Sequence, residues 1–383
     1  MSRFNEMTLD FIALIRSVYR EESDVPLHRP LFIGNEIKYL HQCIESNFVS
    51  SAGEKIAEFE EQISKYVGAK YAVATVNGTS ALHLSLRIVG VSTGDEVLTQ
   101  SATFVATSNA IKYCGAQPVF IDIDIDTLGL SPQSLRDFLT INAIKKDHKV
   151  FNKITGNRIA ACIPMHTFGL PCRIEEILEI CREWSLPVVE DSAESLGSFV
   201  NEKHTGTFGH IGILSFNGNK VITTGQGGMI ITDNEHFATK AKFVSTTAKM
   251  PHPYEYFHSE LGYNYRLANL NAALGCAQLE QLESFLAKKR LLSDRYKVFF
   301  DNYKDICSYI GGHWLFSILF FDPVNKSKFI EETNKNRIFT RPLWHLNSEL
   351  PMYADCFKDQ LVNSKNISLK LVNIPSSVPR ESL

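Results

Sequence analysis

The sequence lacks the long apolar run that a membrane-spanning helix needs. Its unbroken hydrophobic stretches are well short of the roughly 18 to 20 residues required to cross a bilayer. The opening residues, MSRFNEMTLDFIALIRSVYR, carry charges throughout and lack the apolar block of a signal peptide. We therefore expect a cytoplasmic protein with no membrane segment and no membrane partner.

The sequence also lacks a large excess of either positive or negative charge. Lysine and arginine number 39 against 42 aspartates and glutamates, and the formal net charge at pH 7 is -3. Proteins that bind nucleic acid usually carry a basic surface, so we expect no nucleic-acid partner. Glycine (22) and proline (14) are too few, and hydrophobic residues (44%) too many, for a fibrous or disordered chain.

The eight cysteines contain no CxxC pair, and a chain of 383 residues needs no disulfides to hold its core. We expect reduced and mostly buried thiols. Cys162, His166 and Cys172 lie close together in the sequence, but their spacing fits no common zinc motif. The sequence therefore predicts no metal site.

Seven short β-rich runs lie between residues 71 and 232, with helix-patterned segments between most of them. The runs are residues 71–76, 96–100, 118–123, 159–164, 186–190, 211–216 and 228–232, and the helices are 80–88, 107–114, 132–139 and 173–184. Nearly continuous apolar strands separated by helices are typical of a mostly parallel sheet that is covered on both faces. We expect an α/β fold with a seven-stranded sheet between helices.

Further elements flank this core. Residues 35–47 and 54–67 have the pattern of amphipathic helices, and residues 145–158 form a polar excursion between core elements. A long helix is expected from 268 to about 303, with the basic run at 288–290 on a solvated face. Residues 313–321 and 326–336 predict a strand and a helix of a smaller C-terminal α+β domain. We expect two domains, 1–265 and 266–383.

A turn that follows the first run suggests an anion site. Residues Asn77-Gly78-Thr79-Ser80 open a predicted helix, whose free backbone N–H groups and positive dipole end favour a phosphate. Simple helix capping by the hydroxyl residues is the alternative. This turn alone does not decide between the two.

Two residues at later strand ends point to a specific cofactor. Asp191 follows one run, and Lys220 lies in the loop after the next run, behind Ser215. Pyridoxal phosphate needs a carboxylate for its ring nitrogen, a lysine for its aldehyde, and amides and hydroxyls for its phosphate. Asp191 alone could be a helix cap and Lys220 a solvated loop residue, but together with the Gly78 turn and Phe104, which can stack on a ring, they favour pyridoxal phosphate.

A series of motifs carries a family resemblance across most of the chain. In order they are NGTSALHLSL, GDEVLTQSATFVATSNAI, GAQPVFIDID, PMHTFG, PVVEDSAESLGS, SFNGNK, TTGQGGMIIT and NYRLANLNAALGCAQLEQL. The chain resembles the DegT/StrS family of pyridoxal-phosphate-dependent sugar aminotransferases. It is most similar to the branch that aminates UDP-linked 4-keto-6-deoxy-N-acetylhexosamines. The resemblance implies fold type I of the pyridoxal-phosphate-dependent transferases.

The resemblance also implies roles for residues around the cofactor. Lys220 holds it as a Schiff base and later moves the proton, and Asp191 pairs with its ring nitrogen. Gly78, Thr79, Ser80 and Ser215 bind the phosphate, and Phe104 stacks on the ring. Asn264 reaches the phosphate of the neighbouring subunit, which implies a homodimer with shared active sites.

Two positions depart from the common family pattern. Glu194 stands where the family often has glutamine, near the phenolic oxygen of the cofactor, where a carboxylate repels a phenolate unless it is protonated or turned away. Gln226 replaces a common glutamate and changes only a local contact. Neither change removes a group that the chemistry needs.

The implied reaction moves an amino group from L-glutamate to the C4 ketone of a UDP-linked sugar. Candidates for the substrate pocket, chosen by resemblance and residue chemistry, are Arg29, His166, Tyr263, Arg341 and His345. Either arginine could pair with the diphosphate of the nucleotide sugar. Two other functions are open. The chain could be a sugar dehydratase, although those relatives usually carry histidine in place of Lys220. It could also be a non-catalytic regulator that binds the cofactor, although such a protein needs no complete catalytic set.

Overall fold

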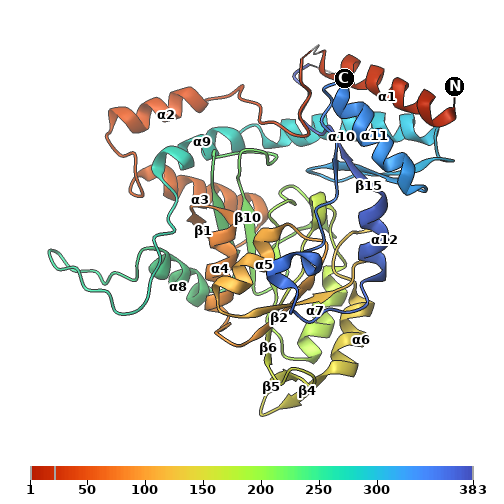
Figure 1. Ribbon diagram of the computed structural model, residues 1–383. Coiled ribbons are helices and arrows are strands. Elements are labelled where there is room, and N and C mark those ends of the chain that lie inside the picture. The colour runs from red at the N-terminus through yellow and green to blue at the C-terminus, as the bar shows by residue number, and fades with distance from the viewer. Residues whose placement is uncertain (1, 21–22, 382–383) are drawn as a thin grey trace.

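The seven strands expected from the sequence form one sheet in the computed structural model, which describes residues 2–20 and 23–381 (Figure 1). Their bounds are β1 Tyr71–Thr75, β2 Glu96–Gln100, β3 Gln117–Ile121, β6 Arg158–Ile163, β7 Val189–Asp191, β10 Ile211–Ser215 and β11 Gly228–Thr232. Hydrogen bonds join β1, β11, β10 and β7 in that order, and β6, β2 and β3 in that order. Bridges from Cys162 to Val188 and from Met165 to Asp191 connect the two sets.

Six of these seven strands run in the same direction. The pairs β10–β7, β2–β3 and β2–β6 are parallel, and so are the bridges between β6 and β7. Strands β1 and β10 are both antiparallel to β11, which alone of the seven runs the opposite way. The mostly parallel α/β sheet is therefore confirmed, and its strands present their carboxyl ends along one edge, where such sheets bind ligands.

Helices cover both faces of the sheet because the strands carry apolar side chains on both faces. One face packs against α4 Gly78–Ile88, α5 Val105–Tyr113 and α8 Glu235–Ser245. The other packs against α3 Glu54–Val67 and α9 Asn269–Leu279 at one end, and against α6 Pro132–Asn142 and α7 Ile174–Glu183 at the other. The polar excursion at 145–158 contains most of a hairpin, β4 Ala143–Lys146 and β5 Lys149–Asn152, paired to the start of β6.

The long helix expected from 268 to 303 is two helices. Helix α9 ends at Leu279 and α10 spans Leu282–Asp301. The expected solvated face at 288–290 is wrong for Lys289, which is 2% exposed and donates to the carbonyl oxygens of Trp314 and Ser376. Helix α10 runs between the two parts of the molecule, so residues that a surface helix would expose are covered.

The C-terminal part has its own antiparallel sheet in the order β12 Cys307–Ile310, β13 Phe316–Phe320, β15 Leu371–Ile374 and β14 Arg341–Pro342. Helices α10, α11 Pro323–Lys335 and α12 Val362–Lys370 accompany it. Helix α1 Arg3–Tyr19, at the other end of the sequence, packs Met7, Phe11 and Ile15 into the same core. We propose the two expected domains, 1–265 and 266–383, with α1 attached to the second.

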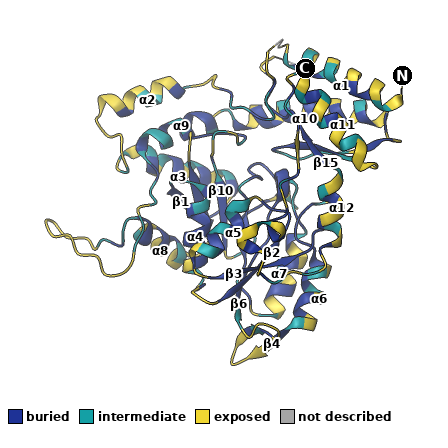
Figure 2. Cartoon of the chain, viewed as in Figure 1, coloured by how far each residue is buried: buried dark blue, intermediate teal, exposed yellow. Residues whose placement is uncertain are grey.

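Two segments project from this body. Helix α2 Glu36–Glu45 extends on one side, and residues 246–266, which we call the arm, extend below it in Figure 1. Figure 2 shows both as largely exposed. Across the described residues, no helix combines the length and apolar character that a bilayer crossing requires.

Candidate active site

A cavity of about 320 Å³ lies at the carboxyl ends of the parallel strands. Its walls come from the loops after β1, β7 and β10, from the start of α5, and from the C-terminal part. The lining residues are Asn77, Gly78, Thr79, Leu82, Phe104, Ala106, Thr107, Met165, Asp191, Ala193, Glu194, Ser215, Asn217, Asn219, Lys220, Gln226, Trp314 and Trp344. The topology thus brings most of the predicted cofactor residues into one pocket.

The turn after β1 forms one end of this pocket. The side chain of Asn77 caps α4 by accepting the backbone N–H of Ser80 at 2.8 Å. Gly78 packs closely here, because an added Cβ would lie 3.1 Å from the Cβ of Ser215 and would push that side chain away by a few tenths of an ångström. Thr79 lines the pocket, whereas Ser80 is only 7% exposed and is not among its lining residues. The helix start and the hydroxyls of Thr79 and Ser215 make a cradle that suits a phosphate.

Asp191 lies at the end of β7, 2% exposed. Burial raises the pKa of its carboxyl, while a hydrogen bond from the Thr107 hydroxyl at 2.7 Å and one from the backbone N–H of Ala193 lower it. These donors stabilise the ionised form in a site with almost no water. An ionised carboxylate in this position suits a protonated ring nitrogen.

Lys220 extends from the loop after β10 toward two partners. Its Nζ lies 3.1 Å from Oε1 of Glu194 and 3.6 Å from the ring centre of Trp314. The other oxygen of Glu194 accepts the backbone N–H of Phe168 at 2.9 Å. Burial raises the pKa of Glu194 to about 6, an effect that the nearby Lys220 opposes. Glu194, whose role the sequence left open, is therefore the direct ion-pair partner of Lys220.

Aromatic side chains form the remaining wall. Phe104 is 49% exposed and meets Trp344 edge to face at 5.9 Å between ring centres. Trp344 and Trp314, two of only three tryptophans in the chain, line the pocket although the sequence did not predict them there. Thr107, beside Asp191, was also missed. The rarity of tryptophan was the available signal, but nothing local connects these residues with Lys220.

His166 is not among the residues that line the pocket of this chain, and its contact with a substrate stays a prediction. Its side chain has no exposed surface, and its backbone N–H donates to the carbonyl of Asp191 at 3.1 Å. The backbone N–H of Cys172 donates to its Nδ1 at 3.2 Å, so Nε2 carries the proton and donates to Glu190 at 3.1 Å. Glu190 also accepts backbone N–H groups from Gly206 and Phe208. His166 is part of a buried polar network that supports the end of β7.

The other predicted substrate residues do not line the pocket of this chain. Tyr263 is half-buried and stacks on Tyr265 with ring centres 5.1 Å apart. Arg341 is exposed and donates to Asn334, and His345 is exposed on the segment after Trp344. Arg29 is half-buried, and its backbone N–H donates to Ser377. Their contact with a substrate stays a prediction.

Asn264 is exposed on the arm, between the two stacked tyrosines. Both tyrosine rings pack edge-on against His83 of α4, with centres 4.9 and 5.9 Å away. This packing fixes the backbone on either side of Asn264. Its amide is available at the molecular surface.

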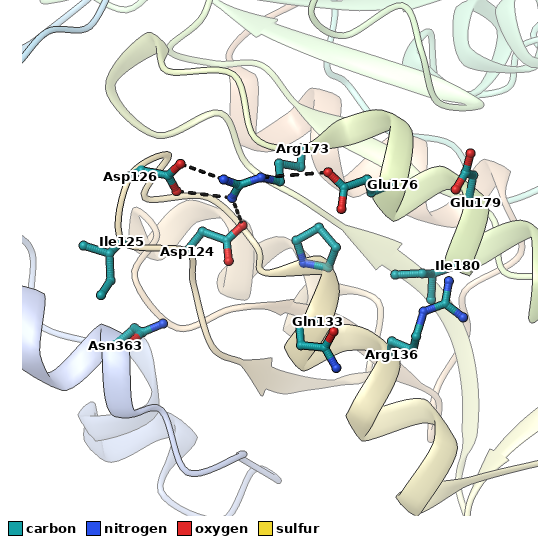
Figure 3. Close-up of a pocket in the computed structure, with 11 residues that line it drawn as sticks. Asp124, Ile125, Asp126, Gln133, Arg136, Arg173, Glu176, Glu179, Ile180 and Asn363 are labelled. Atoms are coloured by element: carbon teal, nitrogen blue, oxygen red, sulfur yellow. Dashed lines mark hydrogen bonds and ion pairs between the residues drawn. The ribbon is translucent and has the colours of Figure 1, made fainter.

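A second, more open cavity of about 570 Å³ lies beneath the other end of the sheet, between α6 and α7 (Figure 3). Arg173 points into it and pairs with Asp124, Asp126 and Glu176. Arg173 is therefore already paired with carboxylates of this chain, and none of the predicted catalytic residues lies there. The pocket around Lys220 is therefore the candidate active site.

The donor set of this pocket fits pyridoxal phosphate. It offers a carboxylate, an amine, an anion cradle and an exposed aromatic ring, and the four come from different loops of one sheet edge. Each matches one functional group of the cofactor. When bound, the cofactor acts as an electron sink for a carbanion that no side chain can stabilise.

Comparisons with known proteins agree with this chemistry. Residues 32–380 match the DegT/DnrJ/EryC1/StrS aminotransferase family. GDP-perosamine synthase of Escherichia coli O157:H7 is 33% identical over 92% of this chain and 93% of its own length. The enzyme of the same name from Caulobacter vibrioides is 32% identical over 92% of this chain and 94% of its own.

Solved structures share the fold. Helicobacter pylori PseC, an aminotransferase involved in pseudoaminic acid biosynthesis, superposes with a TM-score of 0.82 at 22% identity, covering 92% of this chain and 94% of that one. NtdA of Bacillus subtilis, solved with bound cofactor PMP, gives 0.78 at 24% identity, covering 91% and 78%. The fold class implied by the resemblance is confirmed. The chain belongs to the DegT/DnrJ/EryC1/StrS aminotransferase family, and it is a sugar aminotransferase whose cofactor is pyridoxal phosphate.

Proposed function

We propose that the enzyme transfers an amino group from L-glutamate to the C4 ketone of a nucleotide-linked 4-keto-6-deoxy sugar. UDP-4-keto-6-deoxy-GlcNAc is the first candidate, and its product would be UDP-4-amino-4,6-dideoxy-GlcNAc. The observation that carries the proposal is the meeting of Lys220, Asp191 and the Gly78 turn in one pocket. The branch-level resemblance supports the UDP sugar, whereas the relatives named GDP-perosamine synthase support a GDP-linked sugar as the second candidate.

In this mechanism each residue of the pocket has a distinct role. Hydrogen bonds from Thr107 and Ala193 oppose the upward shift that burial gives the pKa of Asp191, and they favour the carboxylate that can pair with a protonated ring nitrogen. With pyridoxal phosphate bound, the free amine of Lys220 would be the base that takes the proton from the donor carbon and the acid that returns it. Glu194 lies 3.1 Å from this amine and can orient it by accepting its hydrogen bond. The same steps in reverse deliver the amine to the sugar.

The presence of Lys220 argues against a dehydratase, which usually carries histidine at this position. The complete set of Lys220, Asp191 and phosphate cradle argues against a regulator without turnover. The eight buried, unpaired cysteines are typical of a protein of the reducing cytoplasm, which is where we place the reaction.

We further propose that the active unit is a homodimer with shared sites. The pocket of one chain is lined by two carboxylates, Asp191 and Glu194, and by one cation, Lys220. A cofactor phosphate and a sugar-linked diphosphate add several negative charges, which need donors from elsewhere. Asn264 on the arm is the proposed donor to the partner's phosphate.

Exposed apolar side chains on α2 and on the arm that carries Asn264 support the dimer. Both segments are largely exposed in Figure 2, and a monomer would leave these side chains in water. The set consists of Ile37 (85% exposed), Ile44 (61%), Met250 (41%), Tyr254 (81%), Tyr256 (78%), Phe257 (62%) and Leu261 (76%). A second copy of the chain is the partner that would cover both projections.

The test is to incubate the enzyme with L-glutamate and UDP-, GDP- and dTDP-linked 4-keto-6-deoxy sugars. Mass spectrometry and NMR of the products identify the sugar and the configuration of the amine, and 2-oxoglutarate is measured in parallel. We expect one nucleotide class to react, and the Lys220→Ala variant to lose the reaction while it still binds the cofactor. Efficient exchange between amino acids and 2-oxo acids, with every nucleotide sugar inert, would overturn the proposal.

A further inference from the structure

Trp314 is held unusually firmly at the wall of the active-site pocket. Its backbone N–H donates to the carbonyl of Phe168 at 3.0 Å, and its own carbonyl accepts from Nζ of Lys289 at 2.9 Å. The indole N–H donates to the carbonyl of Asn219 at 2.7 Å. Only 5% of the residue is exposed. The backbone and the ring edge are therefore both fixed, and the ring cannot turn without breaking a hydrogen bond.

The fixed ring faces the reactive amine. Nζ of Lys220 lies 3.6 Å from the centre of the Trp314 ring, within the range in which an ammonium is attracted to an aromatic face. The carboxylate of Glu194 contacts the same nitrogen at 3.1 Å. The amine thus has one carboxylate contact and one aromatic contact, and its side chain is only 13% exposed. In a site this dry, a cation–π contact is worth more than at the surface.

The loop that carries Lys220 is tied to the same ring. Asn219, the residue before Lys220, supplies the carbonyl that the indole N–H binds. On the other side, the ring of His28 lies 6.5 Å from Trp314, and Lys289 is buried between Trp314 and Ser376. None of these supporting residues lines the pocket, except Asn219. They form a buried support for one wall of the pocket.

We propose that Trp314 is a positioning residue for the amine of Lys220, whose ammonium form it stabilises through its ring face. The contact matters in the half of the cycle in which Lys220 is not bonded to the cofactor. When its amine takes a proton from the substrate carbon, an amine becomes an ammonium, and the charge that develops lies between Glu194 and Trp314. This role rests on the proposed proton transfer by Lys220, but the contact itself does not depend on which sugar is the acceptor.

The test uses the full-length enzyme in its pyridoxamine phosphate form, in which Lys220 is free. Acetic anhydride reacts only with unprotonated amines, so the acetylation rate of Lys220, measured by peptide mass spectrometry from about pH 7 to 11.5, gives a midpoint. The exposed Lys328 on α11 serves as the internal reference. Trp314→Leu, which removes the ring face, should move the midpoint for Lys220 to lower pH by about 0.5 to 1 unit. Trp314→Phe keeps a face and should move it less.

Trp344→Leu is the matched control, because it removes an aromatic ring from the same pocket and no contact joins that ring to the Lys220 amine. It should leave the midpoint unchanged. If Trp314 only shields the Lys220 amine, its removal would raise the acetylation rate at high pH without moving the midpoint. That result for Trp314→Leu would overturn the proposal. An equal shift in Trp344→Leu would overturn it as well. If Trp314→Leu does not fold, the smaller shift of the Lys220 midpoint in Trp314→Phe decides the test. Inactivity toward every nucleotide sugar would contradict the proposed function, but it would not change the labelling result.

Discussion

Asp191 is a buried carboxyl group at the wall of the pocket. Burial raises its pKa, and the hydrogen bond from the Thr107 hydroxyl is the largest of the effects that lower it. In Thr107→Val, which has nearly the same shape, the pKa of Asp191 should rise further and the ring nitrogen should lose its partner for part of the time. We expect the rate of the glutamate half-reaction to fall about tenfold, since a hydrogen bond to a charged group contributes roughly 1.5 kcal/mol or more. Stopped-flow absorbance measures this rate.

Thr103 provides the control for this substitution. Its hydroxyl lies 2.9 Å from that of Thr107 but does not contact the carboxylate. Thr103→Val should therefore slow the reaction much less. Equal rates in Thr107→Val and the unmodified enzyme would show that the N–H of Ala193 is a sufficient donor.

The buried amine of Lys289 should make the free energy of unfolding depend on pH. Burial lowers its pKa from 10.5 to about 7. Between these two values the unfolded chain binds one more proton than the folded chain, so the folded state gains stability as the pH rises above 7. Below pH 7 both states carry the proton and the contribution is constant. Urea unfolding from pH 6 to 9 should show that the stability difference, unmodified enzyme minus Lys289→Met, increases by about 1.4 kcal/mol per pH unit above 7.

The neighbouring Lys288 is the control for this pH series. It is half-buried and donates to carbonyl oxygens of Pro379 and Arg380 near the C-terminus. Lys288→Met should change stability by the same amount at every pH. A flat difference for Lys289→Met as well would mean that Lys289 stays protonated in the fold up to high pH.

Among individual residues, the sequence predicted the site residues that directly follow strands. It did not predict those that come from distant parts of the chain. Asp191, Lys220 and the Gly78 turn stand next to apolar runs, and parallel strands bring such ends together. Trp314 belongs to the C-terminal part, and its place beside Lys220 follows from packing that no local pattern records. His166 also follows a strand, but a short turn directs it inward to Glu190.

Strand β11 presses against the turn that begins α4, and this contact shapes the phosphate cradle. A Cβ added at Gly228 would lie 2.4 Å from the carbonyl carbon of Asn77 and 2.7 Å from the nitrogen of Gly78. In Gly228→Ala the turn must therefore move. We expect a loss of roughly 1–3 kcal/mol in stability, as for overpacked cores, and at least tenfold weaker cofactor binding in equilibrium dialysis.

Gly218→Ala serves as the control for this element. Its Cβ would approach nothing closer than the carbonyl oxygen of Gly225 at 3.7 Å, so its effect on cofactor binding should be small. Cofactor binding that is equally strong in Gly228→Ala and the unmodified enzyme would mean that the turn can shift without losing the phosphate.

Element by element, the apolar periodicity identified the strands of the large sheet and most of the helices that cover it. It joined α9 and α10 because the helical spacing of apolar residues continues across the break at Glu280 and Gln281. Helices α1 and α8 were not expected from the sequence. Helix α1 lies far in sequence from the core that it covers, so its apolar face had no visible partner.

At the scale of the whole molecule, the shared-site dimer predicts complementation. Lys220→Ala and Asn264→Asp chains should each be inactive alone, the first because it lacks the amine, the second because a carboxylate repels the partner's phosphate. In a co-expressed heterodimer, one site combines the intact Lys220 of one chain with the intact Asn264 of the other. We expect activity near half that of the unmodified dimer.

The heterodimer is purified through two different affinity tags, and its mass is verified before the assay. The double variant paired with unmodified chains is the matched control, since in it neither site has both residues intact. Verified heterodimers without activity would contradict the shared site. Light scattering that shows a monomer at assay concentrations would contradict the dimer itself.

The core that α1 shares with α10 and α11 also has a consequence for synthesis of the chain. Met7, Phe11 and Ile15 leave the ribosome some three hundred residues before the side chains that cover them, such as Phe300 and Phe329. During that interval the apolar face of α1 is uncovered. A chain that stops before Phe300 never covers this face, so we expect truncated products to aggregate more readily than the full chain.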